Sequence, residues 1–242
     1  ITLTATISGV TDSAVTVALS TSGTATEGTD YGTISDITIS AGATTGTATL
    51  DPTDDNVYEG DETAIIDISG VSGKSGVTEN STQQVSVTIS ENESAPTVTL
   101  ATSATSIAEN AGSSLTLTAT LSVATTADVT VALSTSGTAT EGTDYTDGSG
   151  NIDDIVISAG STTGTVSFTP TDDSLYDATS NETATIAISG VSGGSASESG
   201  TQTVTITITD NESAPTVTLA TSGTSIAENS SSTLTLTATL SV

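Results

Sequence analysis

Apolar side chains alternate with threonine and serine over many short runs of this chain. Alternation with a period of two is typical of half-buried β-strands, and no stretch has the 3.6-residue period of an amphipathic helix. About seven short strands between turn residues predict an all-β fold, a two-sheet β-sandwich. In the stretch 94–212 the predicted strands are Val98–Ala101, Leu115–Ser122, Val129–Ser134, Ile155–Ser158, Gly164–Thr169, Thr183–Ser189 and Thr203–Thr209.

The core predicted by this alternation is made of small side chains. One Phe and four Tyr serve the whole chain, and Val, Ile, Leu and Ala each bury modest free energy at ~25 cal/mol per Å². We therefore expect another contribution to stability, with bound metal as the candidate. The predicted inward positions are Leu115, Leu117, Val129, Val131, Leu133, Val166, Phe168, Ile186, Ile188, Val204, Ile206 and Ile208.

The chain also repeats itself. ESAPTVTLATSATSIAEN at 93–110 returns as ESAPTVTLATSGTSIAEN at 212–229, and VTVALSTSGTATEGTDY at 15–31 returns at 129–145. A period of about 115 residues is the size of a domain and too long for a solenoid unit. We expect three pieces: residues 1–93, a copy that lacks its opening strand; residues 94–212, a complete copy; and residues 213–242, the opening strands of a third.

The composition excludes several classes of function. The formal net charge is −28, with 29 acidic residues, one basic residue (Lys74, expected at the surface) and no His, Cys or Trp. Such a chain cannot neutralise phosphate, so we expect no nucleic-acid partner and no contact with anionic membranes. No apolar run approaches the ~20 residues that span a bilayer. Without His or Cys, Ser and Thr have no activating base, and we expect no enzyme.

The acids gather in the predicted loops and leave the strands almost free of charge. Alternate loops of a sandwich fall at the same pole, where neighbouring carboxylates would repel by ~4 kcal/mol at an effective dielectric of 20. A divalent cation removes that cost, and a set of oxygen ligands favours Ca²⁺ over Zn²⁺, Cu²⁺ or Mg²⁺. The alternative is a solvated acidic surface. We prefer that alternative for Glu27, Glu141, Asp61, Asp153 and Asp154.

The ordered motifs SIAEN, GT–DY, PTDD–Y(E/D) and TITDNE resemble those of the Calx-β domain. The resemblance implies an immunoglobulin-like sandwich that binds Ca²⁺ at one pole, near the junction with the next domain. In the first copy it assigns the ligand role to Asp30, Asp54, Asp55, Glu59, Glu62, Glu91 and Glu93. In the later copies it assigns that role to Glu109, Asp144, Asp172, Asp173, Asp177, Asp210, Glu212 and Glu228. Because the first copy lacks the SIAEN glutamate, its site is expected to be incomplete.

Together these features predict a structural, calcium-binding segment of an extracellular or cell-surface stalk or filament. Its partners would be calcium ions and neighbouring copies of itself, and calcium at the domain poles would stiffen the array. The alternatives are a calcium-sensing regulatory module and a carbohydrate-binding module, although the lack of Trp counts against the latter. A further hypothesis is that residues 213–242 complete the first domain of another molecule by strand addition. The competing interpretation is that the chain simply continues covalently.

Overall fold

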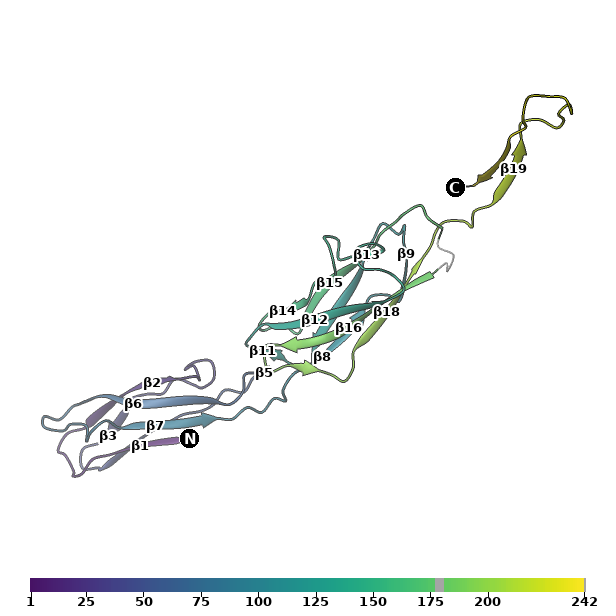
Figure 1. Ribbon diagram of the computed structural model, residues 1–242. Helices are drawn as coiled ribbons and strands as arrows, with labels where there is room; N and C mark the ends of the chain where they lie inside the picture. The colour runs from purple at the N-terminus through teal and green to yellow at the C-terminus, as the bar shows by residue number, and fades with distance from the viewer. Residues whose placement is uncertain (177–180, 242) are drawn as a thin grey trace. The chain divides into compact units, whose positions relative to one another are not determined.

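The computed structural model describes residues 1–176 and 181–241 (Figure 1). They form twenty β-strands. No helix in this described part is long and apolar enough to cross a membrane. The chain separates into two compact units, the first formed by Ile1–Pro96 with Ser122–Ala127 and the second by Thr97–Leu121 with Asp128–Val242.

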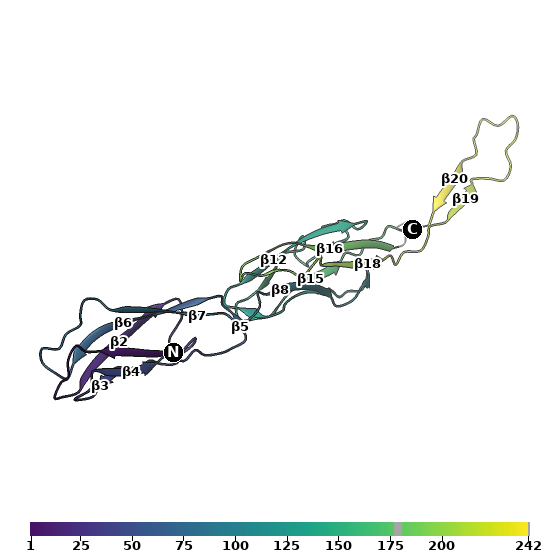
Figure 2. The ribbon, with the colours of Figure 1, turned by 90° about the horizontal axis from the view of Figure 1, so that it is seen from below.

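The second unit is a sandwich of two five-stranded sheets (Figures 1 and 2). The first sheet runs in the order β13 (Tyr145–Thr146), β15 (Thr163–Pro170), β10 (Leu115–Leu121), β8 (Thr97–Thr102) and β17 (Ser197–Glu198). The second runs in the order β14 (Ile155–Ile157), β12 (Val129–Gly137), β16 (Asn181–Ser192), β18 (Thr203–Thr209) and β9 (Ser106–Ala108). The predicted all-β sandwich is confirmed.

The core of the second unit lies between these sheets, and its residues follow the predicted alternation. Leu117, Phe168 and Ile186 are completely buried. The rings of Tyr145 and Phe168 stack with their centroids 4.7 Å apart. Each of the seven predicted strands is present, whereas β9, β13, β17 and β11 (Ala124–Thr125) were not predicted. Those four strands are only two or three residues long, which is too short for an alternating pattern to register.

The first unit repeats part of this arrangement. One sheet pairs β1 (Thr2–Thr6) with β4 (Thr45–Thr49), and the other runs in the order β3 (Ile37–Ile39), β2 (Val15–Gly23), β6 (Glu62–Ser72) and β7 (Gln84–Ile89). A short parallel pair joins β5 (Val57–Tyr58) to β11. Tyr31 and Leu50 lie in its core, where they correspond to Tyr145 and Phe168. Among the residues that the structure describes, the first unit has no counterpart of β8 or β9.

Both units carry the same irregularity in the strand that leads to the acidic loops. The ladder between β2 and β6 shifts register at Ala18/Leu19, and the ladder between β12 and β16 shifts at Ala132/Leu133. The amides of Leu19 and Leu133 donate to Asp36 Oδ1 and Asp154 Oδ1, each at 3.0 Å. Asp154 is exposed, as the solvated-surface interpretation expects, and its carboxylate also accepts from the amide beside the bulge.

Gly23 and Gly137 end these strands at a close approach between two backbones. Their φ values are 116° and 125°, in the region that only glycine adopts freely. A Cβ on Gly23 would meet Thr63 O at 2.1 Å, and a Cβ on Gly137 would meet Thr183 O at 2.0 Å. The glycines thus allow the chain to turn sharply from the sheet into the loops that carry Asp30 and Asp144.

The last described residues form a hairpin of β19 (Val217–Thr221) and β20 (Leu236–Leu240), which Figure 2 shows side by side. Its antiparallel ladder pairs Val217 with Leu240 and Thr221 with Leu236. Every residue of both strands is exposed. The apolar side chains of this hairpin therefore have no core of their own.

Candidate metal centre

Asp30 and Asp144 are held by the same tight turn in the two units. The Asp30 amide donates to Thr26 O at 2.9 Å, and the Asp30 side chain accepts from the Thr26 amide at 2.5 Å. Asp144 and Thr140 repeat both bonds, at 2.9 and 2.6 Å. The turn buries Asp30, which keeps only 8% of its surface exposed. A fixed, buried carboxylate is a suitable first ligand for a cation.

The first acidic site consists of Asp30, Glu59 and Glu62. One carboxylate oxygen from each lies within 4.8 Å of the others. These acids come from the loop after β2, the residue after β5 and the first residue of β6. They surround a cavity of about 40 Å³, which is also lined by Asp55, Glu91 and Glu93. Three loops far apart in the sequence thus meet around one small acidic cavity.

Glu91 is fixed in its ionised form by backbone amides. Glu91 Oε2 accepts from the amides of Glu59 and Gly60 at 2.5 and 2.8 Å, and Oε1 accepts from those of Asn92 and Glu93 at 2.9 Å each. Burial raises the pKa of Glu91, but these amide bonds outweigh it and lower the pKa to about 2. The negative charge beside the first acidic site is therefore permanent above pH 3.

The surroundings of Glu59 and Glu62 raise their pKa values, whereas those of Glu91 lower its pKa. Burial, followed by the negative charge of Asp30 and the hydrogen bond with it, raises the pKa of Glu62 to about 6. Burial also raises the pKa of Glu59, with additional effects from Asp30, Asp55 and Glu91. Desolvation and like charges both disfavour the ionised form. Without a cation, a proton on Glu62 therefore neutralises part of this charge once the pH falls below about 6.

The second acidic site consists of Glu109, Asp210 and Glu212, again with one oxygen from each within 4.8 Å of the others. Glu109 directly follows β9, keeps only 8% of its surface exposed and accepts from the Asn211 amide at 3.1 Å. Burial, together with the neighbouring Glu212 and Asp210, raises the pKa of Glu109 to about 7. The hydrogen bond from the Asn211 amide acts in the opposite direction and lowers it. A neighbouring cavity of about 10 Å³ is lined by Glu109, Asp144, Asp173, Glu182 and Asp210.

A buried carboxylate oxygen in the second acidic site has no hydrogen-bond partner. In the described residues, Glu212 Oε2 is buried without a donor, although its other oxygen accepts from Asn211 Nδ2 at 2.6 Å. A buried polar atom without a partner costs about 1–3 kcal/mol, and more when it is charged. The donor set contains only oxygens, which hard divalent cations prefer. The residues of this site therefore fit a bound hard cation.

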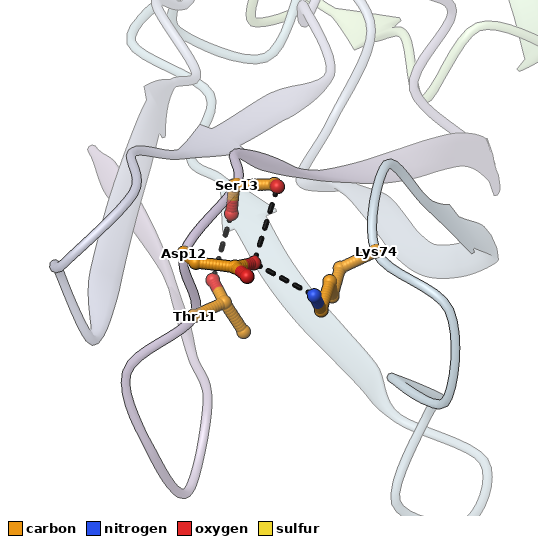
Figure 3. Close-up of polar contacts among 4 residues, drawn as sticks. All are labelled: Thr11, Asp12, Ser13 and Lys74. Carbon is orange, nitrogen blue, oxygen red and sulfur yellow. Dashed lines mark hydrogen bonds and ion pairs between the residues drawn. The ribbon is translucent and has the colours of Figure 1, made fainter.

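The single basic side chain does not serve either acidic site. Lys74 Nζ lies 2.7 Å from Asp12 Oδ1, which also accepts from Ser13 Oγ at 3.2 Å (Figure 3). Lys74 follows the far end of β6, an eleven-residue strand that starts at Glu62. At 3.3 Å per residue these ends lie roughly 33 Å apart. Compensation of the acids therefore falls to protons or to ions from solution.

Comparison of the sequence with models of known protein families identifies the family of this chain. The sequence model of the Calx-beta domain matches residues 2–93 and again residues 91–212. The chain belongs to the Calx-β family. A search of curated proteins found no match.

Solved structures similar to this chain include several Calx domains. The apo-form Calx CBD1 domain is 18% identical, covers 48% of this chain and 99% of its own, and has a TM-score of 0.39. CBD12 from CALX1.2 is 17% identical over 86% of this chain and 92% of its own, with a TM-score of 0.36. The calcium binding domain CBD12 of CALX1.1 is 18% identical over 77% of this chain and 72% of its own, with a TM-score of 0.33.

The two Calx-β repeats gather most of the predicted ligands, though in different combinations. In the first repeat, Asp30, Glu59 and Glu62 form the acidic site, while Asp55, Glu91 and Glu93 line its cavity. In the second repeat, Glu109, Asp210 and Glu212 form the site, while Asp144 and Asp173 line the adjoining cavity. The first repeat has no SIAEN glutamate among its described residues, and its acidic site forms around Asp30 instead.

Three predicted ligands lie elsewhere, and a fourth is outside the described residues. Asp54 accepts from Asn92 Nδ2 at 3.0 Å, outside the first acidic site. Asp172 is exposed, and so is Glu228 in the turn between β19 and β20. Asp177 lies outside the described residues. The ligand role of these four residues remains a prediction from the sequence.

Glu182 is the cavity-lining acid missing from the predicted ligands. It corresponds to Glu62, since ETAII at 62–66 aligns with ETATI at 182–186. An insertion before it obscures this alignment, yet the shared ETA motif is a usable signal. Conversely, the solvated-surface interpretation is wrong for Glu27 and Glu141, which are half-buried. Glu27 accepts from Thr21 Oγ1 and the Ile34 amide at 2.8 and 2.9 Å, and Glu141 repeats this pattern.

The raised pKa values predict how the metal-free protein responds to pH. Glu62 and Glu109 bind protons more tightly in the folded state, with pKa values of about 6 and about 7. Their contribution to stability is present below the unfolded pKa and is lost as the pH rises through the folded values. In chelator, the free energy of unfolding should therefore fall between pH 5 and pH 7.5, measured by urea denaturation with circular dichroism.

The lowered pKa of Glu91 acts in the opposite direction at lower pH. Its contribution is present above the unfolded pKa and is lost as the pH falls towards about 2. Metal-free stability should consequently peak near pH 4.5. Replacing both Glu62 and Glu109 by Gln should flatten the decline above that maximum. A free energy of unfolding that rises steadily from pH 5 to pH 7.5 in chelator would contradict this account.

Proposed function

We propose that this chain is a calcium-binding structural segment of an extracellular or cell-surface stalk or filament. In this proposal, calcium bound at the two acidic sites stiffens the connections between successive Calx-β repeats. The observation that carries the proposal is the position of the acids along the chain. Each site includes or adjoins the last acids of one repeat, immediately before the segment that leads into the next.

The connection after the first repeat is short and restricted. Only Ser94, Ala95 and Pro96 separate Glu93 from β8. Proline fixes its own φ and limits the residue before it, so this connection has few free torsions. Glu91 and Glu93 line the cavity of the first acidic site. An ion held there would immobilise the connection at its start and reduce the remaining freedom.

The second repeat ends in the same way. Asp210 and Glu212 belong to the second acidic site, and Pro215 precedes β19 by two residues. The amide of Glu212 donates to Asp210 Oδ1 at 2.8 Å, which closes a local turn. An ion bound by this turn would anchor the start of the following hairpin. Two equivalent positions on one chain support a repeated mechanical role.

The size and chemistry of the cavities support an ion rather than a larger ligand. Cavities of about 40 and 10 Å³ are far below the ~300 Å³ of small-molecule pockets. This counts against carbohydrate binding at the two acidic sites. Oxygen-only ligands from several loops favour Ca²⁺ over Mg²⁺, because Ca²⁺ accepts six to eight ligands in irregular geometry.

A calcium-sensing module is the second candidate, because a calcium binding domain CBD12 is among the similar structures. The two candidates differ in affinity. Calcium sensors have dissociation constants of about 10⁻⁷–10⁻⁵ M, whereas extracellular modules bind at about 10⁻⁴–10⁻³ M. Isothermal titration of the whole chain with calcium measures this directly. A micromolar dissociation constant would favour sensing, and one near 10⁻⁴ M or weaker would favour the structural role.

Small-angle X-ray scattering tests the stiffening. We expect millimolar calcium to increase the maximum dimension of the chain and to narrow its spread of conformations, because bound ions restrict the connections. The variant Glu93→Gln should reduce this response at the first connection. Asp67→Asn removes the same charge but retains the acceptor for Gln84 Nε2, so it should respond as the parent does. Identical scattering in calcium and in chelator would refute the structural role.

A further inference from the structure

Each repeat carries one half-buried glutamate, Glu27 or Glu141, that holds the same two kinds of hydrogen-bond donor. Glu27 Oε2 accepts from Thr21 Oγ1 at 2.8 Å, and Glu27 Oε1 accepts from the Ile34 amide at 2.9 Å. Glu141 repeats both bonds, at 2.8 Å from a threonine hydroxyl of β12 and at 2.7 Å from a backbone amide. We call Glu27 and Glu141 the loop glutamates. Because both repeats contain them, their bonds are a property of the domain.

The loop glutamates stand apart from the acidic sites. Among the described residues, Glu27 is neither part of the first acidic site nor in the lining of its cavity. The same holds for Glu141 at the second acidic site. Each carboxylate has both oxygens occupied by donors from its own strand and loop. The geometry therefore assigns them a role other than direct contact with an ion.

The bonds of each loop glutamate enclose the turn that carries a predicted ligand. Thr21 lies in β2, before the turn, and Ile34 lies beyond Asp30. Ile34 is itself in the core, with 9% of its surface exposed. Glu27 thus ties the turn to a strand on one side and to a core residue on the other.

The second repeat shows that this arrangement holds when the loop is longer. Glu141 accepts from an amide eleven residues further along the chain, whereas Glu27 accepts from one seven residues further. Even so, Asp144 makes the same two backbone bonds within its turn as Asp30 does. The loop glutamate therefore holds the turn in one geometry while the chain beyond it varies in length.

The backbone of the turn has a separate attachment to the core. The Thr53 amide donates to Asp30 O at 2.9 Å, and Asp144 O has an equivalent donor at the same distance. The tyrosine that follows each aspartate keeps only 1% of its surface exposed. Loss of a loop glutamate should therefore loosen the turn without unfolding the repeat.

We propose that Glu27 and Glu141 are positioning residues that set the calcium affinity of the acidic site in their own repeat. This inference rests on the proposed calcium binding. A group already held in its bound position loses less freedom when an ion binds, and hydrogen bonds to a carboxylate are stronger than neutral ones. The loop glutamates act on calcium through Asp30 and Asp144, which they hold at the pole of the sandwich.

Isothermal titration of the whole chain with calcium tests this inference one site at a time. In a Glu109→Gln background, which leaves the first acidic site to be measured alone, Glu27→Ala should weaken binding by roughly 10–100-fold, as for other residues that orient metal ligands. In a Glu62→Gln background, Glu141→Ala should weaken the second acidic site to a similar extent. Parent-like affinity in both alanine variants would overturn the inference and leave the proposed function standing. Absence of calcium binding by the parent chain would refute both.

Glu27→Gln separates position from charge. Gln keeps an oxygen for the Ile34 amide, and its amide group can donate to Thr21 Oγ1, because a hydroxyl accepts as well as donates. This variant should bind calcium nearly as tightly as the parent. Thr21→Val removes one of the two bonds and retains the glutamate, so it should show an intermediate loss. Equal losses of affinity in Glu27→Gln and Glu27→Ala would show that charge rather than position matters, and would overturn the inference.

Glu79→Ala is the matched control for the loss of one charge and one backbone bond in the same repeat. Glu79 Oε1 accepts from the Gln83 amide at 2.7 Å, in the loop between β6 and β7 at the end of β6 remote from Glu62. Like Glu27→Ala, it should lower the free energy of unfolding in chelator, measured by urea denaturation, but it should leave calcium affinity unchanged. A parallel loss of affinity in Glu79→Ala would mean that general destabilisation explains the effect of Glu27→Ala, against the inference.

Discussion

Calcium at millimolar concentration should raise the thermal unfolding midpoint of this chain by roughly 10–20 °C. At a dissociation constant near 10⁻⁴ M, about 10 mM calcium is a hundredfold excess, which contributes about 2.7 kcal/mol per site. One kcal/mol shifts the midpoint of a domain of this size by about 4–8 °C. The small side chains of the core leave stability strongly dependent on such a contribution. Bound calcium would also offset the burial and the like-charge repulsion that raise the pKa values of Glu62 and Glu109.

Differential scanning calorimetry measures this shift, first in chelator and then with calcium. Chelator added after calcium should restore the original midpoint, and magnesium at the same concentration should have a smaller effect. Sodium chloride at matched ionic strength is the necessary control, because salt alone screens repulsion between exposed acids. A midpoint that responds equally to sodium chloride would mean that the acids form only a solvated surface.

Substitution of the buried glutamates should separate repulsion from metal binding. We expect Glu62→Gln and Glu109→Gln each to raise stability in chelator, since Gln keeps the shape and removes a charge that its neighbours repel. In calcium the same variants should lose most of the metal-dependent stabilisation of their own repeat, about 2.7 kcal/mol at saturation. The effect of each substitution thus reverses sign between the two conditions.

Calorimetric titration with calcium should show the loss repeat by repeat. Glu62→Gln should abolish binding at the first acidic site and leave the second intact, and Glu109→Gln should do the reverse. Asp67→Asn and Asp154→Asn are the controls, because each removes a charge while retaining the oxygen that accepts from Gln84 or Leu133. If the control variants lose as much calcium binding as the site variants, total charge rather than site geometry governs the response.

Much of the architecture could be predicted from the sequence because the relevant signals are local. Alternation of apolar and polar residues predicts each long strand and its inward face, including Leu117, Phe168 and Ile186. The repeated motifs predict two equivalent units and the loops that carry acids. Strands of two or three residues, such as β13 and β17, escaped prediction because they depend on neighbours distant in sequence.

The fold determines which acids accept from backbone amides and which ones meet at an acidic site. Glu27 and Asp30 lie three residues apart in the same loop, yet Glu27 binds the Ile34 amide while Asp30 faces Glu59 and Glu62. Their residue types do not distinguish these roles. The distinction arises because the turn at Thr26 directs one carboxylate into the loop and the other to the pole of the sandwich.

The sequence by itself determined the all-β class, the tandem repeats and the acidic, oxygen-only chemistry, since composition and periodicity are properties of the chain. Only the tertiary structure decided which carboxylates meet. It built the first acidic site around Asp30 and the second around Glu109. The physical reason is that repulsion, desolvation and strand pairing act across a few ångströms, between residues that the sequence separates by tens of positions.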